Sequence, residues 1–253
     1  MEASNRNLKI APEQTYWAPT NLTTTPEGEE KLMQKMQISI EKLKKSGFFA
    51  AFLNQIRNSE ASFHFHRVTE SEHKLKMVIY GIGSIESSKS SEVQLSLAIL
   101  MKKEVDWIGD VEVFDPIISL TELKVIEELG CCVLSVNEWC QREAVNPILF
   151  FMPRCRVTLF ENLLKTNWRH GMLNRIIILG NSFKHHGMLN RIITLGNSFK
   201  HQKNYRLKHF CAIQPFTKEF EISNLSEAYI RAFGGLSWHF FSVGCEANLK
   251  LTC

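Results

Sequence analysis

The sequence has no apolar run that approaches the ~18 residues needed to cross a lipid bilayer. Its first 30 residues lack both the apolar core of a signal peptide and the many arginines of a transit peptide. These absences lead us to expect an intracellular protein without membrane association.

Cysteine spacing argues against two further classes of protein. The seven cysteines are odd in number and form no Cys-x-x-Cys pair, so we expect reduced, packed thiols and neither a disulfide framework nor a zinc module. His64 and His66 would place two imidazoles on one face of a strand, but no cysteine pair accompanies them, and we predict no metal site. The Cys-Pro dipeptide typical of thiolate-bound haem is also absent, although haem stays open as a ligand.

Charge is not concentrated enough to indicate nucleic-acid binding. The net charge is only +4, and residues 184–209 are basic without an acidic residue among them. However, only Phe199 and Tyr205 supply aromatic rings in this segment. A solvated charged segment is the simpler interpretation, so we do not expect nucleic acid as a partner.

The stretch from Met77 to Ser84 begins the predicted core. A short apolar run is followed by Gly81 and Gly83, then by a serine-rich loop, and then by a helical pattern that starts at Glu92. Strand, glycine turn and helix in this order are typical of the first unit of a doubly wound α/β sheet.

Strands and helices alternate along the rest of the chain. We predict a Rossmann-like, doubly wound, mainly parallel sheet flanked by helices, with an N-terminal helical extension. Continuous apolar strands indicate that both faces of the sheet are covered. The expected strands are 62–66 at an edge, 77–80, 111–114, 131–136, 148–152, 175–179, 210–216 and 238–243. The expected helices are 29–56 divided at Gly47, 92–103, 121–129, 157–168 and one near 225–233.

We predict a single domain over residues 31–243, preceded by a flexible arm at 1–30 on which Tyr16 and Trp17 could dock, and followed by a short tail at 244–253. One internal feature breaks the α/β pattern within this domain. Residues 170–185 recur at 186–201 with a single change, from Ile178 to Thr194. Two near-identical copies do not make a solenoid, which indicates a tandem duplication inside a complete fold.

A sheet has one position for the strand that both copies encode. Only the first copy, with strand 175–179, leaves enough chain before the next expected strand for a parallel crossover, which needs at least about 10–12 residues. Thr194 would also bring a hydroxyl group into a buried strand. We therefore predict that the first copy is the central strand and that the second lies outside the sheet as a surface helix or a disordered loop.

Candidate ligand-binding residues follow the carboxyl ends of the predicted strands, where open α/β sheets bind ligands. They are Gly81, Gly83, Ser84, Asp115, Asn137, Cys155, Gly180, Asn181 and Ser182. Glycine lets a backbone approach a ligand closely, and Asp115 stands where such folds place an acid that binds a ribose. The structural alternative is that the glycines only form the turn and Asp115 pairs locally. Both interpretations stay open.

The spacing restricts the chemistry of a ligand. Glu86 stands at the third glycine position of G-x-G-x-x-G, so a nucleotide with a pyrophosphate is disfavoured, whereas a cofactor of the S-adenosylmethionine type is compatible. No catalytic residue is predicted, because Gly180-Asn181-Ser182 lacks the spacing of a nucleophile elbow.

Six short segments carry a resemblance to a known family. They are Tyr80-Gly81-Ile82-Gly83-Ser84, Val113-Phe114-Asp115-Pro116, Phe150-Phe151-Met152-Pro153-Arg154-Cys155, Asn162-Leu163-Leu164 with Asn167-Trp168, Leu179-Gly180-Asn181-Ser182-Phe183, and Ser237-Trp238-His239-Phe240-Phe241. In this order they resemble the sensitivity-to-red-light-reduced family, particularly its plant members. The chain departs from the family pattern at Arg154, where the motif usually reads Met-Pro-His-Cys, and in the duplication.

The resemblance implies a regulatory role in circadian timing and red-light (phytochrome) signalling, in the cytoplasm and the nucleus. It implies no known reaction. We therefore expect a protein that acts through a protein partner or a bound small molecule. The alternative is a cofactor-using enzyme on the same fold, of which a methyltransferase-like enzyme fits best.

Overall fold

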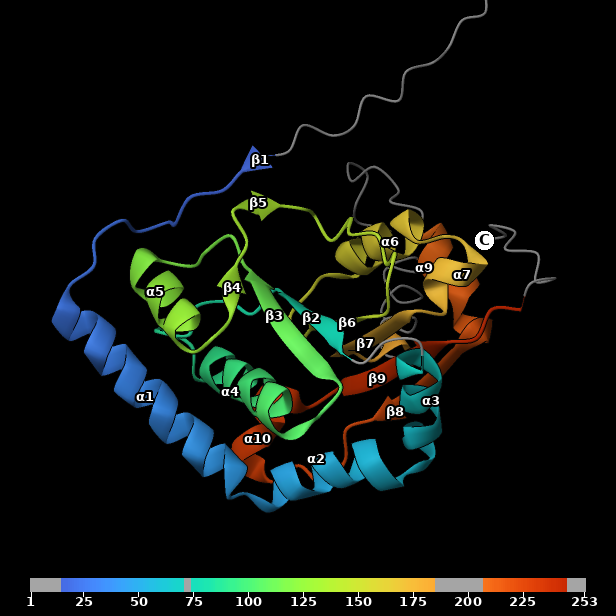
Figure 1. Cartoon of the computed structure of the whole chain (residues 1–253), viewed down its shortest axis with the longest axis horizontal. Coiled ribbons are helices and arrows are strands. Elements are labelled where there is room, and N and C mark those ends of the chain that lie inside the picture. The colour runs from blue at the N-terminus through green and yellow to red at the C-terminus, as the bar shows by residue number, and fades with distance from the viewer. Residues whose placement is uncertain (1–14, 71–73, 185–206, 245–253) are drawn as a thin grey trace, which may run out of the picture.

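The computed structural model describes residues 15–70, 74–184 and 207–244. A seven-stranded sheet forms the centre of the molecule, in the order β4-β3-β2-β6-β7-β9-β8 (Figure 1). Its strands are β2 (Leu75–Tyr80), β3 (Ile108–Phe114), β4 (Cys132–Val133), β6 (Ile148–Met152), β7 (Ile176–Asn181), β8 (Thr217–Glu221) and β9 (Leu236–Phe241). A separate two-stranded sheet pairs β1 (Thr15–Tyr16) with β5 (Val136–Asn137).

The sheet is wound in two directions from its middle. β2 pairs in parallel with β3 on one side and with β6 on the other, and β4 and β7 extend this parallel set. β9 then runs antiparallel between β7 and β8. The strand order reverses between β2 and β6, which is the place where doubly wound sheets commonly bind ligands. The predicted fold class is confirmed.

Helices cover both faces of the sheet (Figure 1). One face packs against α1 (Pro26–Lys44), α2 (Gly47–Asn58), α3 (Glu60–Thr69), α4 (Lys89–Glu104), α5 (Leu120–Glu128) and α10 (Glu227–Phe233). The other packs against α6 (Val157–Thr166), α7 (His170–Leu173) and α9 (Lys208–Ile213), which is followed by the 3-10 turn η1 (Gln214–Phe216). None of the helices in these described ranges is long and apolar enough to cross a membrane.

Local sequence signals set the ends of the N-terminal helices. Thr25 caps α1 by accepting the backbone N–H of Gly28, and Pro26 occupies the first turn. Ser46 caps α2, which begins at Gly47, so the predicted division of this helical region is confirmed.

α4 lies between the sheet and α1, and is buried on every side from Ser90 to Met101. The sequence predicts only one apolar face for this helix, because the cover that α1 supplies cannot be read locally. Its buried polar residues find partners within the protein: Glu92 pairs with Lys89 and Lys35, and the Gln94 amide donates to the carbonyl oxygen of Ala232 at 2.6 Å.

Two predicted strands are wrong. Residues 62–66 lie in α3, because Ser59 caps this helix and Ala61, Phe65 and Val68 present one buried face at helical spacing. Residues 210–216 form α9 and η1 instead of a strand. The Glu161 carboxylate accepts the backbone N–H groups of His209 and Phe210 and so holds the start of α9, a long-range contact that periodicity does not reveal.

A third predicted strand, 131–136, is divided. Cys132–Val133 joins the main sheet as β4, whereas Val136–Asn137 forms β5 in the small sheet with β1. Trp17, next to β1, docks on the domain: its backbone N–H donates to Ser135 and its indole to the Pro116 carbonyl. The predicted domain boundaries stay a prediction, although α1 already begins at Pro26.

The first copy of the duplication provides the central strand, as predicted. Residues 176–181 form β7, which pairs with β6 and with β9. The second copy, at 186–201, lies outside the described residues.

Candidate functional site at the carboxyl edge of the sheet

Two glycines shape the turn between β2 and α4. Gly81 and Gly83 have φ angles of +71° and +75°, a left-handed conformation that other residues adopt only at a cost. A Cβ at Gly81 would lie 2.9 Å from Cys155 Sγ, and a Cβ at Gly83 would lie 2.9 Å from Ser91 Oγ. Both positions therefore require glycine for conformation and for space within the protein itself.

Asp115 follows β3, and its carboxylate joins two loops. Oδ2 accepts the backbone N–H of Gly83 at 2.8 Å, and Oδ1 accepts that of Ile117 at 3.1 Å. The residue is only 6% exposed. Since each oxygen already has a backbone partner, Asp115 fixes the glycine turn to the segment that follows β3.

Arg154 reaches from the end of β6 across the glycine turn. Its Nη1 donates to Ser91 Oγ at 3.0 Å and to Ser88 Oγ at 3.2 Å. The same nitrogen would lie 3.2 Å from a Cβ placed on Gly83. Ser88 is the N-cap residue of α4. The guanidinium therefore lies at the amino terminus of α4, where such folds hold anionic ligand groups.

Cys155 packs under the same turn. Its thiol donates to the carbonyl oxygen of Tyr80 at 3.3 Å. Burial first, and the neighbouring Cys155 thiol second, raise the pKa of the Cys140 thiol well above its ordinary value. Cys131, Cys140 and Cys155 are free thiols and are buried as small apolar side chains.

The predicted residues at the carboxyl end of β7, Gly180 and Asn181 within the strand and Ser182 directly after it, connect the strand to its neighbours. A Cβ on Gly180 would lie 3.0 Å from the ring of Phe160, and Asn181 pairs with Leu236 of β9. Ser182 is buried, and its backbone N–H donates to the carbonyl oxygen of Gly235 at 2.8 Å.

The remaining two predicted residues form local turns. Ser84 Oγ accepts the backbone N–H of Ser87 at 3.1 Å in the loop before α4. Asn137 lies in β5, and its Oδ1 accepts the backbone N–H of Trp139 at 2.9 Å. The structure thus brings Gly81, Gly83, Asp115 and Cys155 together, and places Asn137 in the separate small sheet.

A cofactor of the S-adenosylmethionine type would bind where Gly83, Asp115 and the start of α4 meet. There the Asp115 carboxylate already accepts two backbone N–H groups, and the Arg154 guanidinium covers the approach to Gly83. With these contacts in place, the residues do not fit this cofactor. In the described ranges no three His, Cys, Asp or Glu side chains are grouped to hold a metal ion.

A chain of charged side chains lies on the sheet face beside β2 and β3, and the sequence did not predict it. Glu112 pairs with Lys76 and with Arg142. Arg142 also pairs with Glu138, at 2.5 Å between Nη2 and Oε1, and the Tyr80 hydroxyl donates to the same carboxylate. Lys76 interrupts the otherwise apolar β2, and Glu112 lies between Val111 and Val113 of β3, which is the signal that could have revealed them.

The pKa values in this network follow from burial and pairing. Burial raises the pKa of Glu112, but hydrogen bonds from Lys76 and Arg142 outweigh it and hold that pKa below its ordinary value. Burial acts to lower the pKa of Arg142, yet its carboxylate partners raise it. Burial and the bond to Glu138 raise the pKa of Tyr80. Glu112 and Arg142 are therefore charged and Tyr80 is neutral at pH 7.

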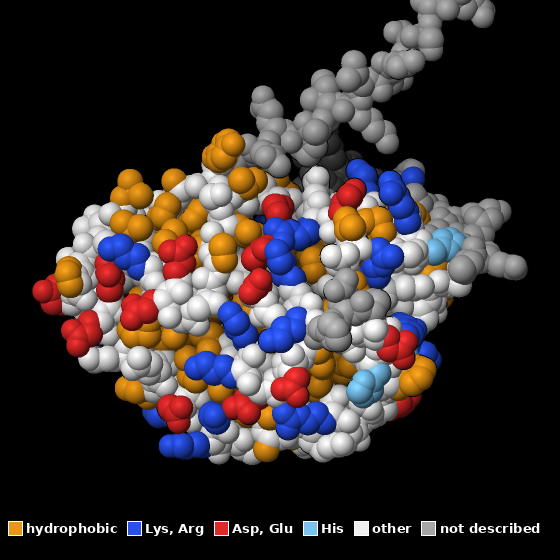
Figure 2. All heavy atoms as spheres, in the orientation of Figure 1, with side chains coloured by type: hydrophobic (Ala, Val, Ile, Leu, Met, Phe, Trp, Pro, Cys, Tyr) orange, Lys and Arg blue, Asp and Glu red, His pale blue; other side chains and the backbone are white. Residues whose placement is uncertain are grey.

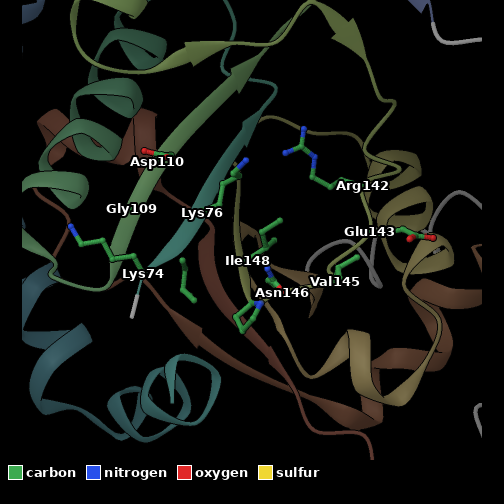
Figure 3. Close-up of a pocket in the computed structure, with 11 residues that line it drawn as sticks. Lys74, Lys76, Gly109, Asp110, Arg142, Glu143, Val145, Asn146 and Ile148 are labelled. Carbon is green, nitrogen blue, oxygen red and sulfur yellow. The ribbon is translucent and has the colours of Figure 1, made fainter. Parts of the chain in front are cut away.

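A cavity of about 490 Å³ lies at the opposite end of the same strands. The amino ends of β2, β3 and β6 and the segment that precedes β6 line it (Figure 3). None of the nine predicted site residues lines this cavity. It exists because the described chain between β4 and β6 contains no helix to cover the amino half of β2 and β3.

Asn167 holds the wall of this cavity in place. Its side chain is fully buried, accepts the backbone N–H of Ala144 at 2.7 Å, and donates to the carbonyl oxygens of Arg142 at 2.8 Å and Leu163 at 2.9 Å. The Arg175 guanidinium donates to the carbonyl oxygen of Val145 in the same wall. Asn167 belongs to one of the six segments that carry the family resemblance, and its hydrogen bonds to the cavity wall give it a structural role.

The chain shares sequence with known relatives, in one case over most of its length. The sequence model of the SRR1 domain matches residues 40–240. The Arabidopsis thaliana protein called Protein SENSITIVITY TO RED LIGHT REDUCED 1 is 46% identical over 236 residues, 93% of this chain and 83% of that protein. The SRR1-like protein of Mus musculus is 35% identical over 124 residues, 46% of this chain and 48% of its own.

Two solved structures are similar to the chain at a low level. A mutant of MtNAS is 16% identical with a TM-score of 0.42, over 85% of this chain and 70% of that one. The plantazolicin methyltransferase BpumL, in complex with a desmethylPZN analog and SAH, is 11% identical with a TM-score of 0.37, over 86% and 99% of the two chains.

A mainly parallel sheet that reverses its winding at β2 and β6, with helices on both faces, defines a Rossmann-like α/β domain. Within that class, this chain belongs to the SRR1 domain family. The predicted resemblance is therefore confirmed, and the close homology supports a regulatory protein of the SRR1 type.

Proposed function

We propose that this chain regulates red-light signalling and circadian timing, in the cytoplasm and the nucleus, through a protein partner or a bound small molecule. The observation that carries the proposal is the 46% identity, over 93% of the chain, with the Arabidopsis protein named for reduced sensitivity to red light. Such coverage includes both the glycine turn and the segments that pack around it.

Exposed apolar side chains favour the protein partner. Tyr16 is 82% exposed, Trp139 54% and Ile117 52%, and they come from segments that hydrogen-bond to one another through β1, β5 and Thr20. Figure 2 shows hydrophobic side chains gathered over the segment from β1 to α1 and over α5. Tyrosine and tryptophan are enriched among the residues that dominate binding energy at protein interfaces.

Complementation tests the proposal. The chain is expressed in an Arabidopsis line that lacks its relative, and seedling growth under red light and the phase of a clock reporter are measured. We expect both responses to recover. A chain that accumulates normally without restoring either response would refute the proposed function.

A surface variant distinguishes the two modes of action. Tyr16→Ala with Trp139→Ala should lose the recovery if these side chains bind a partner, whereas Ile38→Ala, at a 56% exposed position on α1, should keep it. Equal recovery by both variants would favour the bound small molecule.

One observation favours the enzyme as a second candidate. The left-handed glycine turn lies where the strand order reverses, which is where cofactors bind in this class. Differential scanning fluorimetry against S-adenosylmethionine, NAD and haem tests this, because a bound ligand raises the melting temperature by mass action. A rise with S-adenosylmethionine that Asp115→Ala abolishes would favour the enzyme. No rise with any of the three would favour the partner.

A further inference from the structure

The cavity at the amino edge of the sheet has a cationic inner end. Lys76 and Arg142 point toward one another there, whereas Glu143 points away from them (Figure 3). Both cations pair with Glu112, which is not among the lining residues. The cations therefore keep a defined position at the cavity.

The hydrogen bonds of the described residues leave donors unused on both cations. Arg142 gives its Nε and one N–H of Nη2 to Glu138 and one N–H of Nη1 to Glu112, so one N–H remains on each Nη atom. Lys76 gives one of its three N–H groups to Glu112. An oxygen with several lone pairs could accept these remaining donors together.

The rest of the lining is suited to an apolar group. Val145, Pro147 and Ile148 line the cavity beside the cations. The wall that carries Val145 is held by Asn167 and Arg175, so the cavity is formed before a ligand arrives. A volume of about 490 Å³ lies within the range of roughly 300–1,000 Å³ that is usual for small-molecule sites.

We propose that this cavity binds a small organic oxyanion, a carboxylate or a phosphate monoester with an apolar body. The anionic oxygens accept the spare N–H groups of Lys76 and Arg142, since charge-assisted hydrogen bonds of this kind are about twice as strong as neutral ones. The apolar body packs on Val145 and Ile148. Asp110 at the rim limits the negative charge that the site accepts, which favours one oxyanion group over a polyanion.

Nuclear magnetic resonance titration of the full chain tests the proposal. The probes are benzoate and phenyl phosphate, and neutral benzamide is the matched control. We expect saturable shifts of the amide signals of residues 74–76, 109–110 and 142–148 with either anion, and much weaker ones with benzamide. The anion that binds more tightly shows whether the site prefers a carboxylate or a phosphate monoester. Equal effects of benzoate and benzamide would overturn the proposal.

Two variants locate the binding. Val145→Trp fills the cavity from a position that is 62% exposed, and Lys76→Met removes one donor group; each should weaken anion binding by tenfold or more. Lys102→Met, on α4 where the ammonium donates to the Gly130 carbonyl, should bind as the parent does. Melting temperatures confirm folding, and Val145→Trp alone carries the test if Lys76→Met fails to fold. Unchanged binding by a folded Val145→Trp variant would also overturn the proposal.

Discussion

At the carboxyl edge of the sheet, the protein's own side chains occupy the place of a ligand, whereas at the amino edge charged side chains surround a cavity. Asp115 and Arg154 both contact the glycine turn at the first edge. At the second, Lys76 and Arg142 meet at the inner end of a cavity of about 490 Å³. Doubly wound sheets bind ligands at the carboxyl edge. A glycine turn at the carboxyl edge thus indicates a doubly wound fold. Whether a ligand can reach that turn depends on the side chains that contact it.

The crossovers explain the difference between the two edges. The turn between β2 and α4 is tight and is closed by a helix that the sheet and α1 bury. The described chain between β4 and β6 has only β5, so the amino half of the sheet face is left without a helical cover. Charged residues occupy the uncovered strand positions, because an apolar side chain there would remain in contact with water.

The largest effect on stability is expected at the carboxyl edge, from Gly81→Ala. The left-handed φ costs about 1–2 kcal/mol for any other residue, and the contact of the new Cβ with Cys155 Sγ adds about 1–3 kcal/mol. Urea unfolding should show a loss of about 3 kcal/mol. Gly171→Ala is the control, because nothing lies within 4 Å of its added Cβ, and it should be nearly neutral. Equal stability of the two variants would show that the glycine turn is not closed by packing.

Asn167→Ala should have the next largest effect, and it should act at the amino edge. It leaves the buried N–H of Ala144 without its acceptor, at about 1–3 kcal/mol. Hydrogen exchange should accelerate in residues 142–147 and stay unchanged in 81–84. Asn162→Ala is the control, because its amide donates only to an exposed turn at Trp139. Equal acceleration at both edges would mean that Asn167 supports the whole fold and not one wall.

Sequence patterns predicted most of the fold, because buried strands and helix caps are local signals. The strand 148–152 and the break at Gly47 match the structure. The segment of α3 over residues 62–66 was mistaken for a strand because phenylalanine and histidine alternate there, which suggested two faces, although Phe63 is 68% exposed on a helix. α9 was mistaken for a strand because the carboxylate that holds its start, Glu161, lies far away in sequence.

The sequence predicted which residues lie at the strand ends of the candidate site, but not the side-chain contacts between them. The glycines and Asp115 follow from strand ends, which the sequence marks clearly. That Arg154 reaches Ser88 and Ser91 could not be predicted, since it depends on how β6 and α4 lie beside each other. The cavity is also invisible in the sequence, because a missing helix in a crossover leaves no motif.

Low pH should remove the contribution that Glu112 makes to the free energy of unfolding at the amino edge. Its pKa is lowered in the folded protein, so its pairing stabilises the fold above the ordinary value of 4.5 and is lost as pH falls through the lowered pKa. At pH 7, Glu112→Gln should cost about 1 kcal/mol, as expected for a partly exposed pair. The difference should vanish in urea unfolding at low pH. Glu143→Gln, which points away from the cations, should show no such dependence. A difference that persists at low pH would mean that Glu112 acts by packing.

Arg154→His should have the smallest effect on stability, within about 0.5 kcal/mol, because the arginine is exposed. A histidine is too short to reach Ser88 and Ser91 across the glycine turn, so the carboxyl edge should open. Fluorimetry with S-adenosylmethionine should then show a larger rise in melting temperature than in the parent chain. An unchanged response would mean that Asp115 and the turn close the edge without Arg154.

The same variant tests the chemistry of the residue in the complementation assay. Histidine titrates near neutral pH and can coordinate a metal, whereas arginine stays protonated and cannot. Arg154→Gln also removes the guanidinium without supplying an imidazole, which makes it the matched control. If the imidazole of the family motif has a role, Arg154→His should restore red-light and clock responses better than the parent chain and better than Arg154→Gln. Equal recovery by all three would show that position 154 serves only to cover the carboxyl edge, and that such cover does not limit the function.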